Sequence, residues 1–160
     1  MWVDATVLSN FAVAGGVSFL VRVTDDLVTS VAVAEEIETG VEAGYDHLET
    51  VSDALERRIP VVTVERDDTF RRLRERLDLG EATCLRGAAR RGGIVATDDA
   101  AARDAAERRT IDVTGSVGLL AVGVRRDEIS PETANQWLDR WQTERGYYAP
   151  VDRIESVLGD

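Results

Sequence analysis

The sequence predicts an α/β domain of the three-layer α/β/α type, with a five-stranded, mainly parallel sheet. Two observations support this. Short apolar, β-branched runs of four to six residues alternate with amphipathic helical patterns, which is typical of βα units. The 160 residues are enough for one domain with its own core, and 44 % of them are apolar. A parallel sheet with helices on both faces follows from this alternation.

The first half of the chain supplies three of the five strands. We expect a short strand at residues 1–4, a helix at 6–14, and an ambiguous apolar run at 17–23. A second strand at 27–29 precedes a helix at 31–44, for which Ser30 is the candidate N-cap. A helix at 48–57, a strand at 60–64 and a charged, solvent-facing helix at 67–77 complete this half.

The second half continues the same alternation. We expect a helix at 81–91, a strand at 93–97, a helix at 99–108, a strand at 110–114 and a helix at 116–124. Ser130 and Pro131 have the pattern of an N-cap followed by a first-turn proline. The last helices carry Trp137 and Trp141, which lie four residues apart on one face. Packing within the domain is the first interpretation of this pair, and a dimer or partner contact is the second.

Composition restricts the possible partners and compartments. The formal charge is −11, from 30 Asp and Glu against 19 basic residues, all of them Arg. An acidic, Lys-free chain resembles proteins of salt-loving archaea, where the Debye length of about 3 Å in molar salt screens the global charge. No apolar run reaches the roughly 20 residues of a membrane span, and no secretory leader pattern opens the chain, so we expect a cytoplasmic protein without membrane contact. Cys84 is expected to be a buried thiol.

Acidic residues occur where strands end or helices begin. Asp4 follows the first strand, Glu81 opens a helix, and Asp98 and Asp99 close the fourth strand. Because parallel strands bring their carboxyl ends to one edge, we expect these acids to meet there, together with Glu36. Oxygen ligands of this kind suit Mg²⁺ or Mn²⁺, which can activate water for phosphodiester hydrolysis. Singly, each acid has an ordinary alternative as a cap, a turn residue or part of a solvated helix face.

The ordered set resembles the PIN domain family. The segments are Asp4-Ala-Thr6 with Leu8 and Asn10, AEEI, LGEA, VATDDAAARDAA and VTGSVGLL, and their second half is similar to the VapC-like ribonuclease toxins. The resemblance covers about residues 1–125, so we divide the chain into a PIN-like catalytic domain at 1–125 and a C-terminal helical extension at 126–160 packed on it.

The resemblance implies a metal-dependent endoribonuclease that cleaves single-stranded RNA, the toxin of a toxin–antitoxin pair; the homodimer expectation comes from Trp137 and Trp141 instead. It implies Asp4, Glu36, Glu81 and Asp99 as ligands of Mg²⁺ or Mn²⁺, with Asp98 as the rival of Asp99 and Glu35 as the rival of Glu36. Thr6 would help to hold the metal-site water, and Arg103 and Ser116 match further motif positions. The acidic surface and the absence of Lys favour a second interpretation, a non-catalytic PIN-like module that binds RNA or protein.

Overall fold

The computed structural model describes residues 1–159 and contains five short parallel strands. Each strand has only two residues because a helix N-cap or a turn follows almost at once; Asp4, for example, ends the first strand by capping the first helix. The strands are β1 (Trp2–Val3), β2 (Thr29–Ser30), β3 (Val61–Val62), β4 (Val95–Ala96) and β5 (Val113–Thr114).

The strands form two sheets, and this corrects the prediction of a single five-stranded sheet. One sheet has the order β1-β4-β5 and the other pairs β2 with β3, all parallel. A single bridge between Trp2 and Val28 joins them. The hydrogen-bonded ladder between β1 and β2 extends no further. The Thr29 hydroxyl donates to the Val3 carbonyl in place of the Thr29 backbone N–H, which donates to the Pro60 carbonyl instead.

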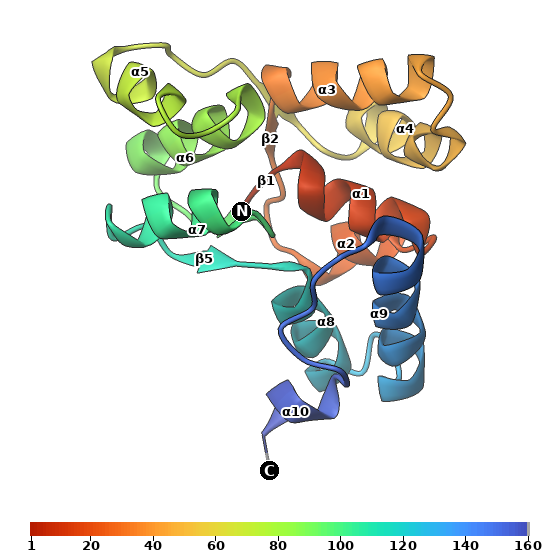
Figure 1. Cartoon of the computed structure of the whole chain (residues 1–160). Helices are drawn as coiled ribbons and strands as arrows, with labels where there is room; N and C mark the ends of the chain where they lie inside the picture. The colour runs from red at the N-terminus through yellow and green to blue at the C-terminus, as the bar shows by residue number, and fades with distance from the viewer. Residues whose placement is uncertain (160) are drawn as a thin grey trace.

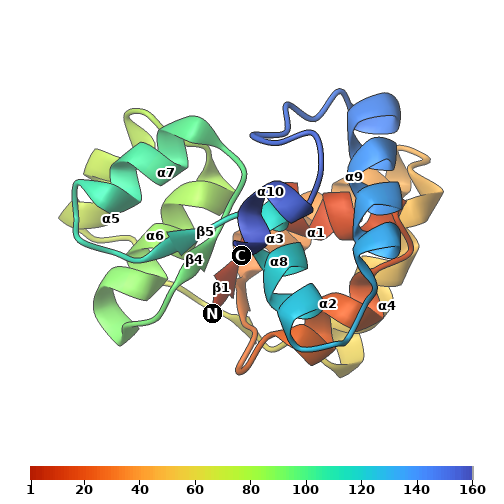
Figure 2. The ribbon, with the colours of Figure 1, turned by 90° about the horizontal axis from the view of Figure 1, so that it is seen from below.

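The helices form two groups with the strands between them (Figure 1). α5, α6 and α7 make one group, α1 to α4 with α8 and α9 make the other, and Figure 2 shows the same division from below. The helices are α1 (Ala5–Val13), α2 (Val17–Val23), α3 (Val31–Glu42), the 3₁₀ turn η1 (Asp46–Leu48), α4 (Glu49–Arg57), α5 (Asp68–Arg74), α6 (Leu79–Arg91), α7 (Ala100–Glu107), α8 (Ser116–Arg125), α9 (Pro131–Arg145) and α10 (Glu155–Leu158).

Two elements differ from the sequence expectations in an informative way. The ambiguous run at 17–23 is helix α2, whose residues Phe19 and Leu20 enter the core. Helix α6 begins at Leu79, two residues before the predicted start, because Asp78 is its N-cap. Glu81 is therefore the third residue of α6, a position that allows its side chain to reach back to the cap.

The C-terminal helix α9 packs on α1 through aromatic side chains. Trp141 is fully buried, donates its indole N–H to the Asn10 carbonyl, and meets the ring of Phe11 edge-on at 5.2 Å between centroids. Trp137 packs against Phe11 and Phe19. Both tryptophans thus serve packing within the domain, which was the first of the two interpretations, and Trp141 has no exposed surface to offer a partner.

Two smaller expectations concern single residues and the membrane. Cys84 is buried and free, and burial raises the pKa of its thiol. Among residues 1–159, none of the helices combines the length and the hydropathy that a membrane crossing requires.

Candidate functional site

Asp4 lies at the end of β1, where its carboxylate is almost completely buried. It caps α1 by accepting the Val7 N–H, and it also accepts hydrogen bonds from the hydroxyls of Thr6 at 2.6 Å and of Thr97. Burial raises the pKa of Asp4 to about 6, and the nearby charge of Asp98 adds to the rise while the three hydrogen bonds oppose it. Asp4 is therefore a pre-oriented carboxylate held in an environment that disfavours its charge.

Thr6 joins the first strand end to the fourth. Its hydroxyl donates to Asp4 and accepts the Asp98 backbone N–H at 3.0 Å. Thr6 therefore links Asp4 and Asp98, which are 94 residues apart in the sequence. Its proposed contact with a metal-site water stays a prediction.

Asp98 is the most heavily hydrogen-bonded acid of the site. Its carboxylate accepts from the Ser116 N–H at 2.8 Å, the Ser116 hydroxyl, the Asn10 amide at 2.9 Å and the Tyr147 hydroxyl at 3.3 Å. Four donors from α1, the start of α8 and the segment after α9 therefore meet on one carboxylate. Asp98 therefore holds these elements together, and its carboxylate oxygens already accept hydrogen bonds from the protein.

Glu81 is held in the first turn of α6 by a capping box. The Glu81 N–H donates to Asp78, and the Glu81 carboxylate accepts the Asp78 N–H at 3.0 Å. Burial raises the pKa of Glu81 to about 7, and the negative charges of Asp78, Asp99 and Asp4 raise it further. Glu81 is consequently near enough to Asp4 and Asp99 for their negative charges to raise its pKa.

Asp99 and Glu36 border this cluster from two helices. Asp99 caps α7 by accepting the Ala102 N–H at 2.8 Å. Glu36 lies on an exposed part of α3, and its Oε2 is 3.1 Å from the place a Cβ on Gly80 would take. Burial and the charge of Asp78 raise the pKa of Glu36. Glu36 therefore lies beside the start of α6, near Asp78.

The arrangement has a limit as a metal site. Within residues 1–159, no three Asp, Glu, His or Cys side chains are close enough together to hold one ion as they are placed. Glu81 responds to the charges of Asp4 and Asp99, and Glu36 lies beside Gly80, but in the described part of the chain these acids do not form a closed cage.

The structure adds residues to which the sequence analysis gave no role. Thr97 and Asn10 belong to the quoted motifs, and each donates to one of the acids. Arg145 is the last residue of α9, and Tyr147 lies in the segment after it. The negative charge of Asp98 acts to raise the pKa of both side chains. No sequence pattern links residues 145–147 to Asp98, so only the folding of α9 back onto α1 could reveal them. Arg103 donates to the Thr97 carbonyl at 3.2 Å.

Comparison with known families agrees with this geometry. A family model described as PIN domain matches residues 1–160, the whole chain. The chain belongs to the PIN domain family. The match includes residues 126–160, which the sequence analysis had placed outside the resemblance. Neither a curated protein nor a solved structure matches the chain significantly.

Membership indicates the general chemistry of the family. PIN domains are generally metal-dependent nucleases, and their chemistry is hydrolysis of phosphodiester bonds. In this PIN domain, the buried acids with raised pKa values gather where three strand ends and the start of α6 meet. Strongly perturbed carboxylates of this kind mark functional sites more often than structural ones.

Proposed function

We propose that this PIN domain is a Mg²⁺- or Mn²⁺-dependent endoribonuclease that cleaves single-stranded RNA at the cluster of Asp4, Glu81 and Asp99, with Glu36 at its border. The observation that carries the proposal is the coupling of Asp4 and Glu81. Both are held by hydrogen bonds in fixed positions, and burial together with neighbouring negative charge raises both pKa values. Such repulsion is relieved when a cation binds.

The donor set fits a hard divalent cation in type. Every candidate ligand is a carboxylate, and hydroxyl groups of Thr6 and Thr97 fix Asp4 from the other side. Mg²⁺ commonly takes one or two protein carboxylates and keeps several waters, so the absence of a three-acid cage among residues 1–159 is compatible with it. A bound ion would supply an activated water and would offset charge on the phosphate.

The protein's own groups have separable tasks in this scheme. Asp4 and Asp99 are the ligand candidates that cap α1 and α7, and Glu81 is the candidate held beside them by the capping box at the start of α6. Asp98 holds α1, α8 and the C-terminal segment in register around them. We assign Asp98 to positioning because its oxygens already accept four hydrogen bonds.

The biological setting is proposed from sequence resemblance. The similarity of the GEA, TDD, AR and TG segments to VapC-like toxins supports a toxin with a cognate antitoxin, and a homodimer is compatible with it. The Lys-free composition and the charge of −11 support a salt-loving archaeal source. Assays in molar salt are therefore the appropriate starting conditions.

A second candidate function is a PIN module that binds RNA or protein without cleaving. It is favoured by one observation: in the described part of the chain, the acids do not form a group of three that can hold an ion. If it is correct, the chain binds partners equally well with and without divalent metal.

The test compares metal binding and cleavage in the full chain. We expect calorimetry to show Mn²⁺ binding by the wild type, and a labelled single-stranded RNA to be cleaved with Mn²⁺ and spared with chelator. Asp4→Asn keeps the helix cap, since Asn caps as well as Asp, and it should lose both properties. The control is Asp53→Asn, which changes an exposed residue of α4 by the same charge. RNA cleavage that survives chelator or Asp4→Asn would refute the proposal.

A further inference from the structure

A cavity of about 650 Å³ includes Glu36 in its lining, and the scheme above gives no role to its other lining residues. It opens between α1, α3, η1 and the end of α9. Its size is within the roughly 300–1,000 Å³ of ligand pockets in proteins. The side chains that line it include Ala5, Ser9 and Val13, spaced four residues apart on one face of α1, together with Glu36, Tyr45, His47 and Arg145.

Residues of the cavity lie next to the acid cluster at two points. Ala5 follows Asp4 directly in the chain, and Glu36 borders both the cavity and the start of α6. At the other end, the charge of Asp98 acts on Arg145. A polymer that lies with one phosphate at the acids can therefore place its neighbouring unit in the cavity.

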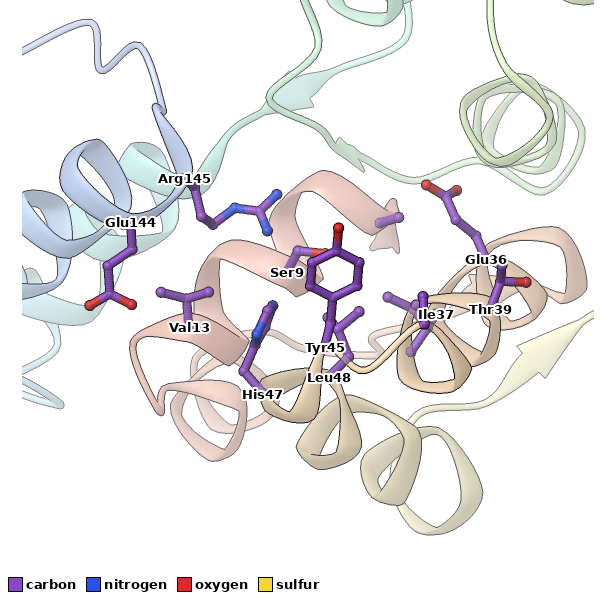
Figure 3. A pocket seen from close by; sticks show the side chains of 13 residues that line it. Ser9, Val13, Glu36, Ile37, Thr39, Tyr45, His47, Leu48, Glu144 and Arg145 are labelled. Carbon is purple, nitrogen blue, oxygen red and sulfur yellow. The ribbon is translucent and has the colours of Figure 1, made fainter.

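The cavity is lined by the guanidinium of Arg145 and by the carboxylates of Glu36 and Glu144, so Arg145 is its candidate anion ligand. Among residues 1–159, no ion pair involves Arg145, although the chain contains many acids. Its neighbour Glu144 pairs with Arg140 instead, and it points away from the Arg145 guanidinium in Figure 3. A guanidinium without a protein partner is a good phosphate ligand because it offers several N–H donors in one plane.

The aromatic groups of the cavity are suited to a base. Tyr45 is 58 % exposed, which is unusual for a large side chain of this domain, and its ring meets that of His47 at 6.0 Å between centroids. Figure 3 shows Tyr45, His47 and Arg145 directed toward the same hollow. Burial and the charge of Arg145 lower the pKa of His47, which keeps the imidazole neutral near pH 7. Exposed aromatic rings next to a cation are the usual platform for unstacked bases.

We propose that this cavity binds one nucleotide of the single-stranded RNA next to the cleaved bond, with the base against Tyr45 and the phosphate on Arg145. The proposal rests on the proposed ribonuclease function and adds a binding position to it. Ser9 and Thr39 line the same cavity and carry hydroxyl groups that can hydrogen-bond a base edge or a ribose. Single-stranded RNA fits because a paired base cannot turn into a pocket of this depth.

The test measures RNA binding without cleavage. The full chain in EDTA is titrated into a short single-stranded RNA that carries one 2-aminopurine, whose fluorescence falls when it stacks on an aromatic ring. We expect Tyr45→Ala to remove the quenching and to weaken binding about 5- to 150-fold, the range for one stacked base. We expect Arg145→Gln to reduce the slope of log affinity against log salt by about 0.7, the value for one phosphate contact with a single strand.

Two matched variants serve as controls. Tyr148→Ala removes a tyrosine that is 93 % exposed and outside this cavity, and Arg108→Gln removes a charge on the far group of helices. Both should bind RNA and quench 2-aminopurine as the wild type does. Equal losses in the controls would overturn the assignment, since the effect would then not belong to this cavity.

The remaining outcomes separate the two proposals. If the wild type cleaves RNA with Mn²⁺ but Tyr45→Ala and Arg145→Gln bind like the wild type, the cavity proposal fails and the ribonuclease stands; occupation by a peptide partner would give this result. If the wild type neither binds nor cleaves RNA, both proposals fail. A rise in the KM of cleavage that parallels the loss of affinity would support the cavity as part of the substrate path.

Discussion

The hydroxyl of Tyr147 donates a hydrogen bond to Asp98 at 3.3 Å, across 49 residues of sequence. The ring of Tyr147 also packs edge-on against Trp141 at 5.8 Å between centroids. Through these two contacts, the segment after α9 is fixed to Asp98 and to α9 itself. The C-terminal part of the chain therefore belongs structurally to the site.

Removal of this hydroxyl should loosen the C-terminal segment. We predict that Tyr147→Phe lowers the free energy of unfolding by about 1 kcal/mol, the net contribution of one hydrogen bond, because the ring stays and only the contact to Asp98 is lost. Chemical denaturation measures this value. Tyr148→Phe is the matched control, since Tyr148 is 93 % exposed and should change stability by less than about 0.5 kcal/mol. Equal effects of the two substitutions would contradict the prediction.

The neighbours Asp98 and Asp99 should respond differently to neutralisation. Asp98→Asn replaces an acceptor of four hydrogen bonds by an amide whose NH₂ cannot accept, so we predict a loss of about 1–3 kcal/mol in stability. Asp99→Asn keeps the cap of α7 and should leave stability nearly unchanged, yet lower cleavage on the order of 100-fold if Asp99 supports charge stabilisation. Denaturation and RNA cleavage with Mn²⁺ measure the two effects. The reverse ranking would make Asp98 the ligand.

The stability of the metal-free protein should fall as the pH rises through the acid range. Asp4 has an ordinary pKa of 3.8 and a pKa of about 6 in the fold, so folding favours its protonated form. The contribution of Asp4 to the free energy of unfolding is fully present below pH 3.8 and is lost as the pH passes about 6. This change is on the order of 3 kcal/mol. Glu81 acts in the same direction up to about pH 7.

Substitution of Asp4 tests this pH dependence directly. Asp4→Asn should remove its part of the decline while keeping the cap of α1, so the variant should be at least as stable as the wild type near pH 7. Asp53→Asn should show the decline of the wild type. Melting curves in EDTA between about pH 4 and pH 8 measure both. A wild type whose stability rises with pH across this range would show that Asp4 is not held in a charge-disfavouring site.

Glu36 and Glu35 form a matched pair on α3. Glu36 lies over Gly80 and its pKa is raised by burial and the charge of Asp78, and the side chains of both glutamates are exposed. We predict that Glu36→Gln lowers RNA cleavage and raises the Mn²⁺ concentration needed for half-maximal rate, and that Glu35→Gln changes neither by more than about twofold, as expected for a surface residue. Cleavage rates across a Mn²⁺ titration provide the measurement. Loss of activity in Glu35→Gln alone would exchange the two roles.

Gly115 tests how tightly Asp98 is held. A Cβ at this position would lie 2.7 Å from the Asp98 carboxylate and 3.1 Å from the Arg103 guanidinium. Gly115→Ala must therefore displace Asp98 from the Ser116 N–H, and we predict a loss of about 1–3 kcal/mol in stability as overpacking requires. Thermal melting of this variant and of Asp98→Asn should show losses that are less than additive, because both disturb the same hydrogen bonds. Full additivity would place the two effects in separate contacts.

The sequence by itself determined the parallel α/β class and the positions of the acids. Apolar runs of short length set the five strands, and each acid next to a strand end or helix start had to lie at the carboxyl edge of a parallel arrangement. Asp4 and Asp99 illustrate this: Asp4 directly follows β1, Asp99 follows β4 by three residues, and each caps the next helix. Family membership was likewise readable from motif order, because the motifs are local in sequence.

Only the tertiary structure decided how these parts connect. The division into two sheets depends on the Thr29 hydroxyl taking the Val3 carbonyl, a contact across 26 residues that no local pattern encodes. The distinct environments of Asp98 and Asp99 depend on Ser116, Asn10 and Tyr147 arriving from three other elements. The cavity with Arg145 exists because α9 folds back on α1 through buried Trp141. Burial and long-range contacts are properties of packing, and they determine charge states and cavities that a linear pattern cannot specify.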